Sequence, residues 1–206
     1  GNGALLIHLY QIILEKTLRG KHLEDFPLAI IGADLNEAAL VSTKENFENS
    51  NVDGVVIKGD IGNPEELANN LQSRFNLDLG QMLNVRSFLD HNRLFSKPEK
   101  IDVGRTGKSS GAFAFRGRRI PNFELEQELS DHFKKWLPYV KQFGLLLIEL
   151  HTIKPELAAA HIGKTAITAY DGTHGFTDQY IVEYDLFKQI LKEVGLEIAP
   201  GSAFAF

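Results

Sequence analysis

Short apolar segments that end in polar residues constrain the fold of this chain more than any other feature. Residues 28–34 and 54–60 each end in an aspartate, and residues 145–151 form a third apolar segment with a glutamate and a histidine near its end. Runs of this length and character are typical of strands that are buried on both faces of a parallel sheet. A fourth strand is expected within residues 81–89.

Helical segments alternate with these strands. Asn36 is a suitable cap for a helix at 37–48, and Asn63 followed by Pro64 is a typical helix start. Further helices are predicted at 4–19, with Gly20 as a left-handed cap, at 124–141, and at 183–194 before Gly195.

Strands that alternate with helices indicate βαβ units. The sequence therefore predicts an α/β fold, a Rossmann-like three-layer sandwich with a mostly parallel sheet. The 206 residues are enough for one domain with a hydrophobic core, so we expect a single domain over 1–206. Residues 93–122 are too long for an ordinary connector, which predicts a basic lid or insertion there.

Composition excludes several classes of protein. The net charge of -5 argues against a general nucleic-acid binder, and the absence of cysteine excludes disulfides and thiolate metal sites. No apolar run approaches the roughly 20 residues that span a bilayer. A cytoplasmic protein is the default expectation.

The chemically interesting residues fall where strands end. In open α/β sheets, ligands bind beyond the carboxyl ends of the strands. The residues at these positions are Asp34, Asp60, His91, Glu149 and His151. Their common placement predicts a site at this edge of the sheet.

A glycine loop precedes the first helix. Gly1 and Gly3 would let the backbone approach a ligand at the helix N-terminus, where free N–H groups lie. Asp34 could then accept hydrogen bonds from ribose hydroxyls, and Asp60 with Ile61 could bracket an adenine ring. The alternatives are that the glycine loop is a simple turn and that Asp34 and Asp60 each cap a helix. A dinucleotide site of the NAD type is not indicated, because Leu6 stands where its third glycine is required.

These segments resemble the cofactor motifs of class I S-adenosylmethionine-dependent methyltransferases. The loop Gly1-Asn2-Gly3 resembles the first motif, and Asp34 and residues 59–61 follow in the family's order. The resemblance implies S-adenosylmethionine as cofactor. It also implies that the family's first strand should lie before Gly1, so we expect a record truncated at the N-terminus and possibly at the C-terminus. The implied cofactor-binding residues are Gly1, Gly3, Asp34, Leu35, Asp60, Ile61 and Asn84.

A narrower resemblance covers three later segments. Residues 84–93, 144–151 and 169–180 are similar to carbon-methyltransferase domains of polyketide assembly lines, of the type that builds the apratoxin starter unit. This implies methyl transfer to carbon of an acyl or polyketide-like substrate. The alternatives are an O- or N-methyltransferase of a small molecule or protein, and a non-catalytic binding module with the same fold.

Methylation of a carbon beside a carbonyl needs a base and a group that holds developing enolate charge. Histidine can act as the base near neutral pH, and Glu149 and His151, two apart on a strand, would project to one face. The candidate catalytic residues are His91, Glu149, His151 and His174. Two histidines and a carboxylate could also hold a mononuclear iron or manganese ion, here through His91, Glu149 and His174. The alternative is that strand-end histidines only form hydrogen bonds.

The other histidines, His8, His22, His132 and His161, are expected to be structural or solvated on helix and loop surfaces.

The segment 93–122 is rich in cations. A solvated loop is one interpretation, and a dock for a phosphopantetheine arm or an acidic acyl carrier protein is the other. RNA is the less favoured partner, because only Phe113 and Phe115 could stack on bases. The cations are Arg93, Lys97, Lys100, Arg105, Lys108, Arg116, Arg118 and Arg119.

Overall fold

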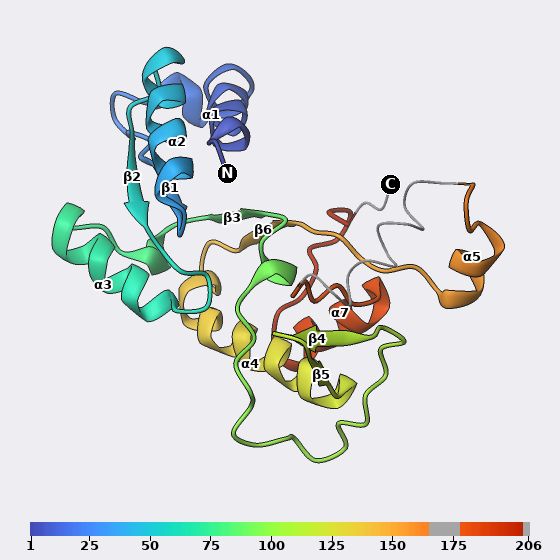
Figure 1. Cartoon of the computed structure of the whole chain (residues 1–206). Coiled ribbons are helices and arrows are strands. Elements are labelled where there is room, and N and C mark those ends of the chain that lie inside the picture. The colour runs from blue at the N-terminus through green and yellow to red at the C-terminus, as the bar shows by residue number, and fades with distance from the viewer. Residues whose placement is uncertain (165–177, 204–206) are drawn as a thin grey trace. The chain divides into compact units, whose positions relative to one another are not determined.

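The computed structural model describes residues 1–164 and 178–203, and the chain forms two compact units (Figure 1). The first unit covers Gly1–Leu77 and the second covers Asp78–Phe206. Each unit is described by itself.

The first unit is built from two parallel strands and three α-helices. Strand β1 pairs with β2 from Ile30 opposite Gly54 to Asp34 opposite Lys58. The elements, in chain order, are α1 (Ala4–Lys16), the 3-10 helix η1 (Arg19–His22), β1 (Ile30–Asp34), α2 (Glu37–Asn49), β2 (Gly54–Lys58) and α3 (Pro64–Phe75).

Helix α2 packs on this strand pair through Phe47, which is 1% exposed. A side chain at Gly54 would place its Cβ 2.6 Å from the Phe47 ring, so the close approach of the helix requires glycine on β2. Gly3 has φ 76 and lies against Thr43, where a Cβ would come within 2.8 Å of the methyl carbon. Both the backbone conformation and the available space therefore favour glycine at this position.

The predicted helix starts are confirmed in this unit. The Asn36 side chain accepts a hydrogen bond from the Ala38 N–H at 2.9 Å, and Asn63 does the same for Glu66. The prediction for Gly20 is wrong, because this residue lies inside η1 and does not have positive φ. The first helix ends at Lys16, since Thr17 adopts an extended backbone and its hydroxyl bonds to the carbonyl of Ile13.

The second unit also contains a parallel strand pair. Strand β3 pairs with β6 from Asn84 opposite Leu145 to Ser87 opposite Ile148. Its elements are the 3-10 helix η2 (Leu79–Gln81), β3 (Asn84–Ser87), the 3-10 helix η3 (Asp90–Asn92), β4 (Phe113–Phe115), β5 (Arg118–Ile120), α4 (Asn122–Val140), β6 (Leu145–Ile148), α5 (Pro155–Ala160) and α7 (Tyr184–Glu193).

The core of the second unit lies between the two long helices and an antiparallel hairpin. Helix α4 contributes Leu125 and Phe133, and α7 contributes Phe187 and Ile190. The ring of Phe133 meets that of Phe187 edge-on, with centroids 5.5 Å apart. The hairpin of β4 and β5 adds apolar side chains to the same cluster. Part of the predicted lid is therefore packed structure.

The α/β class is confirmed, because helices alternate with parallel strand pairs in both units. The complete three-layer sandwich stays a prediction, since the described strands form three two-stranded sheets. All four predicted strands are shorter than their predicted segments. β1 begins at Ile30 rather than at residue 28, and β2 ends at Lys58 rather than at residue 60. The expected strand at 145–151 ends at Ile148, and the one within 81–89 covers only Asn84–Ser87.

Candidate functional site

The glycine loop of the first unit is anchored on helix α2. The Thr43 hydroxyl donates to the Gly1 carbonyl at 3.1 Å, and the Asn46 amide donates to the Asn2 carbonyl at 2.9 Å. Asp34 accepts the Asn36 N–H at 2.9 Å through one carboxylate oxygen, and its other oxygen contacts the terminal amino group of Gly1. The structure thus brings Gly1, Gly3 and Asp34 together at the N-terminus of α1, where the Asn2 side chain accepts the Ala4 N–H at 3.2 Å.

The other predicted cofactor residues are more scattered. Asp60 follows β2, and its carboxylate accepts the Gly62 N–H at 2.8 Å. The alternative role of Asp60 as a helix cap is wrong, because Asn63 caps α3. Leu35 is exposed and Ile61 is half-buried beside these acids in the chain. Asn84 begins β3, whereas His91 follows the other end of this strand. Asn84 and His91 therefore lie at opposite ends of β3. Cofactor contact by these residues stays a prediction.

In the second unit, His91 and Glu149 are in direct contact. His91 Nδ1 lies 2.5 Å from Glu149 Oε1, and the His91 backbone N–H donates to Glu149 Oε2 at 3.2 Å. Both side chains are buried, at 6% and 4% exposure. The contact arises because β3 and β6 are neighbouring parallel strands, and both residues follow their carboxyl ends. Their catalytic role stays a prediction.

β6 ends at Ile148, so Glu149 and His151 both lie beyond the strand, and their common face stays a prediction. His151 lies close enough to Glu149 and His91 for both to influence its pKa. Its ring packs edge-on against Phe187, and Nδ1 lies 3.3 Å from the Val182 carbonyl. Burial lowers the pKa of His151 despite this hydrogen bond. His174 lies outside the described residues.

A buried ionic network surrounds the turn that carries His91. Asp90 Oδ1 accepts hydrogen bonds from Arg86 Nη1 at 2.7 Å and from His132 Nε2 at 2.8 Å. Arg93 pairs with Glu128 and donates from Nη1 to the Asp90 carbonyl at 2.5 Å. Most charged residues of the segment 84–93 therefore bind each other or helix α4, which gives them a structural role in the second unit.

Electrostatics of the network follow from burial and pairing. Burial opposes ionisation of Asp90, but the Arg86 charge and the His132 contact outweigh it, so the pKa of Asp90 lies below its usual value. Burial also lowers the pKa of His132, although Asp90 acts in the opposite direction. His132 is therefore a neutral donor to an ionised carboxylate near pH 7.

The expectation that His132 lies on a helix surface is wrong, since its side chain is 3% exposed. Sequence reasoning missed it because histidine was treated as polar. The signal was present: the apolar residues Leu125, Leu129, Phe133 and Trp136 follow helical spacing, and position 132 falls on the same side.

The predicted metal site does not gain support. Among residues 1–164 and 178–203, no three histidine or acidic residues are grouped closely enough to hold an ion. Glu149 Oε1 is directed at His91 Nδ1, which suits an orienting carboxylate better than a second ligand on the same ion. The third predicted ligand, His174, falls in the part of the chain that the structure does not describe.

The basic segment 93–122 divides into two kinds of cation. Arg93 and Arg105 have side chains 1% and 7% exposed and bind carboxylates, so these two are not available for docking a partner. Arg116, Arg118 and Arg119, on and around the hairpin turn, are exposed. These three form no ion pair within the described part of the chain, and we call them the arginine hairpin.

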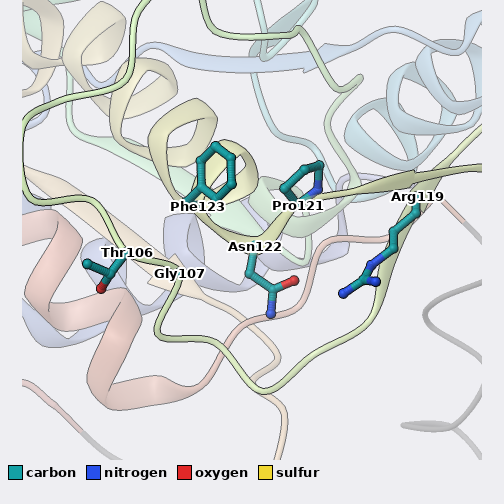
Figure 2. Close-up of a pocket in the computed structure, with 6 residues that line it drawn as sticks. All are labelled: Thr106, Gly107, Arg119, Pro121, Asn122 and Phe123. Carbon is teal, nitrogen blue, oxygen red and sulfur yellow. The ribbon is translucent and has the colours of Figure 1, made fainter.

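A pocket of about 430 Å³ adjoins the arginine hairpin (Figure 2). Figure 2 shows Thr106 and Gly107 on the loop, Arg119 on the strand that leads to α4, and Asn122 at the helix start. The Asn122 amide donates to the carbonyls of Ser109 and Gly111, which holds the loop beside the helix. Pro121 and Phe123 complete the lining.

Parallel strand pairs with a histidine–carboxylate contact at their carboxyl ends, and a glycine loop anchored beside a strand-end aspartate, are compatible with an α/β methyltransferase. A family model described as the AprA MT2-like domain, a methyltransferase family, matches residues 1–206. The chain therefore belongs to the AprA MT2-like methyltransferase domains. No curated protein matches the chain.

None of the helices in the described part of the chain is both long and apolar enough to cross a membrane.

Proposed function

We propose that this domain transfers a methyl group from S-adenosylmethionine to a carbon atom next to the carbonyl of an acyl thioester. The observation that carries the proposal is the contact of His91 with Glu149 beyond the ends of two adjacent parallel strands. Family membership supports methyl transfer in general. The histidine–carboxylate pair supports an acceptor that must lose a proton.

A bound S-adenosylmethionine would supply an electrophilic methyl group on its sulfonium. Glu149 accepts the Nδ1–H of His91 and thereby leaves the Nε2 lone pair free to take a proton. His91 removes the proton from the acceptor carbon while the new carbon–carbon bond forms and the carbon–sulfur bond breaks. S-adenosylhomocysteine and a protonated His91 are left. The roles resemble those of the histidine and carboxylate in other proton-transfer sites.

The first unit supports the cofactor part of the proposal. Asp34 and the loop Gly1–Gly3 lie at the N-terminus of α1, where backbone N–H groups and a carboxylate suit the polar groups of a nucleoside. Asp34→Ala is expected to weaken S-adenosylmethionine binding by about 1–3 kcal/mol, because charge-assisted hydrogen bonds are lost. Calorimetry on the whole domain measures this. Asp53→Ala, at an exposed aspartate near β2, is the matched control.

The catalytic part is tested with His91→Gln and Glu149→Gln. Methyl transfer from labelled S-adenosylmethionine to a malonyl-type pantetheine thioester should fall by about 10²- to 10⁴-fold in His91→Gln, because the general base is lost. Cofactor affinity should stay unchanged. His161→Gln, at an exposed histidine, is the control. Full activity in His91→Gln would exclude this residue as the base and would remove the observation that carries the proposal.

The substrate is proposed to be tethered to an acyl carrier protein. Three exposed arginines whose side chains form no ion pair with residues that the structure describes, next to the pocket that Arg119 and Asn122 help to line, suit an acidic protein surface and its phosphopantetheine arm. Reversal of the arginine hairpin, R116E with R118E and R119E, should slow methylation of a carrier-bound substrate, more strongly at low salt. The free pantetheine thioester is the comparison. Equal rates for both substrates in both proteins would argue against docking here.

A further inference from the structure

The side chain of Asp90 connects strand β3 to helix α4. One oxygen, Oδ1, accepts from Arg86 on β3 and from His132 on α4. The guanidinium of Arg86 also lies over the Trp136 ring, 3.9 Å from its centroid. Arg86 is four residues before Asp90 and belongs to the same strand and turn. His132 is therefore the partner that ties the Asp90 carboxylate to a different element.

The next residue, His91, is held from the other side. Its backbone N–H and its ring both contact the Glu149 carboxylate, which follows β6. Its carbonyl accepts the Tyr180 N–H at 2.7 Å. The short helix η3 is thus attached in two directions. Toward α4, His132 binds the Asp90 side chain, and Arg93, which pairs with Glu128, binds the Asp90 carbonyl. Toward β6 and residue 180, the attachment is His91.

We propose that His132 is a positioning residue, which acts through Asp90 to hold the turn at the angle that brings the His91 ring onto Glu149. The proposal rests on the proposed function only in its last step, where the position of the ring affects methyl transfer. The geometric part concerns this chain alone.

A purely stabilising role explains the arrangement less well. Burying an ion pair and a histidine costs desolvation energy that the contacts often fail to recover, and apolar residues of similar size are frequently as stable. Two donors on one carboxylate oxygen do fix the direction of that carboxylate, and with it the backbone of the turn. Such a constraint matters most when the neighbouring side chain must meet a partner within hydrogen-bond distance.

The test follows the ring N–H proton of His91 by NMR. A 2.5 Å contact with a carboxylate should give this proton a resonance far downfield, identified by its loss in His91→Gln. In His132→Leu, which fills the space but cannot donate, the resonance should shift upfield or broaden beyond detection. In His132→Gln, whose amide can replace the Nε2 donor, it should return toward its original position.

Ser130→Ala is the matched control. Ser130 lies on the same helix, is fully buried and has a hydroxyl with no hydrogen-bond partner among the residues that the structure describes, so this change removes a polar atom without touching Asp90. Its His91 resonance should equal that of the unmodified protein. An unchanged resonance in a folded His132→Leu would overturn the proposal. If His132→Leu does not fold, His132→Asn decides the question, because its amide stays polar but is too short to reach Asp90.

The activity measurement separates this inference from the proposed function. In His132→Leu, kcat for the pantetheine thioester should fall on the order of tenfold to a hundredfold, with KM unchanged and with recovery in His132→Gln. Should the unmodified domain transfer no methyl group to any acceptor, the proposed function fails, while the NMR comparison still decides whether His132 positions His91.

Discussion

Two groups of arginines in the second unit differ in everything except residue type. Arg86 and Arg93 are buried, and each binds a carboxylate that is buried as well. The side chains of the arginine hairpin are exposed and form no ion pair within the described residues, although the backbone N–H of Arg116 donates to Asp178. A guanidinium inside the protein must be neutralised by its own chain, because an unpaired buried charge is costly. Exposed guanidiniums are stabilised by water and stay available to a partner, so the first group determines structure and the second can serve recognition.

The largest effect is expected from the buried group. Arg93→Gln should destabilise the protein by about 3–5 kcal/mol, because Glu128 keeps its buried charge and loses its partner. Unfolding in urea, followed by circular dichroism, measures the change. The double variant Arg93→Met with Glu128→Leu should recover much of the loss. If Arg93→Gln were as stable as the original protein, burial of the Arg93–Glu128 pair would not separate the buried arginines from the exposed ones.

A smaller effect is expected from pH. The pKa of His132 in the folded protein is lowered by burial, so the unfolded state binds more protons below about pH 6.5, the ordinary histidine value. The free energy of unfolding should therefore be constant above pH 6.5 and fall as the pH decreases. One such group contributes at most about 1.4 kcal/mol per pH unit.

His151 has a pKa lowered in the same direction and adds to the slope. Protonation of Asp90 reduces the free energy of unfolding only at lower pH, since the pKa of Asp90 is below the usual carboxyl value. His132→Gln should flatten the slope between pH 6.5 and 5, whereas the exposed His161→Gln should not. Equal slopes in both variants would contradict the assignment to His132.

The smallest effect on stability is expected from the arginine hairpin. Replacing Arg116, Arg118 and Arg119 by alanine should change the free energy of unfolding by less than about 0.5 kcal/mol per residue, because these side chains are exposed and unpaired. The same urea titration tests this. A loss comparable to that of Arg93→Gln would show that the hairpin arginines are structural, and the contrast between the groups would disappear.

Sequence reasoning predicted the part of the site that depends on strand order. His91 and Glu149 meet because they follow neighbouring parallel strands, and that neighbourhood can be inferred from alternating elements. Sequence reasoning did not predict contacts between polar residues that only the packing of distant segments brings together. Arg93 and Glu128 read as loop and helix-surface charges, and only the packing of the loop on α4 buries them together.

The secondary structure shows the same difference between features that local sequence determines and features that depend on contacts with distant segments. Cap residues such as Asn36 and Asn63 are local signals, and the helices begin where these predict. The end of β6 is not a local property. Residues 149–151 are compatible with a strand, but the partner strand β3 ends at Ser87 and is followed by a turn, so the pairing stops at Ile148.

The long connection between β3 and α4 is attached to that helix at several points. Gln127 accepts the Asp102 N–H, Glu126 accepts the N–H groups of Lys108 and Ser109, and Arg93 binds Glu128. In terms of chain entropy, the connection behaves as a series of short loops rather than one loop of about 30 residues. Insertions between two attachment points would then cost little, whereas loss of one attachment would merge two loops and increase the disorder of both.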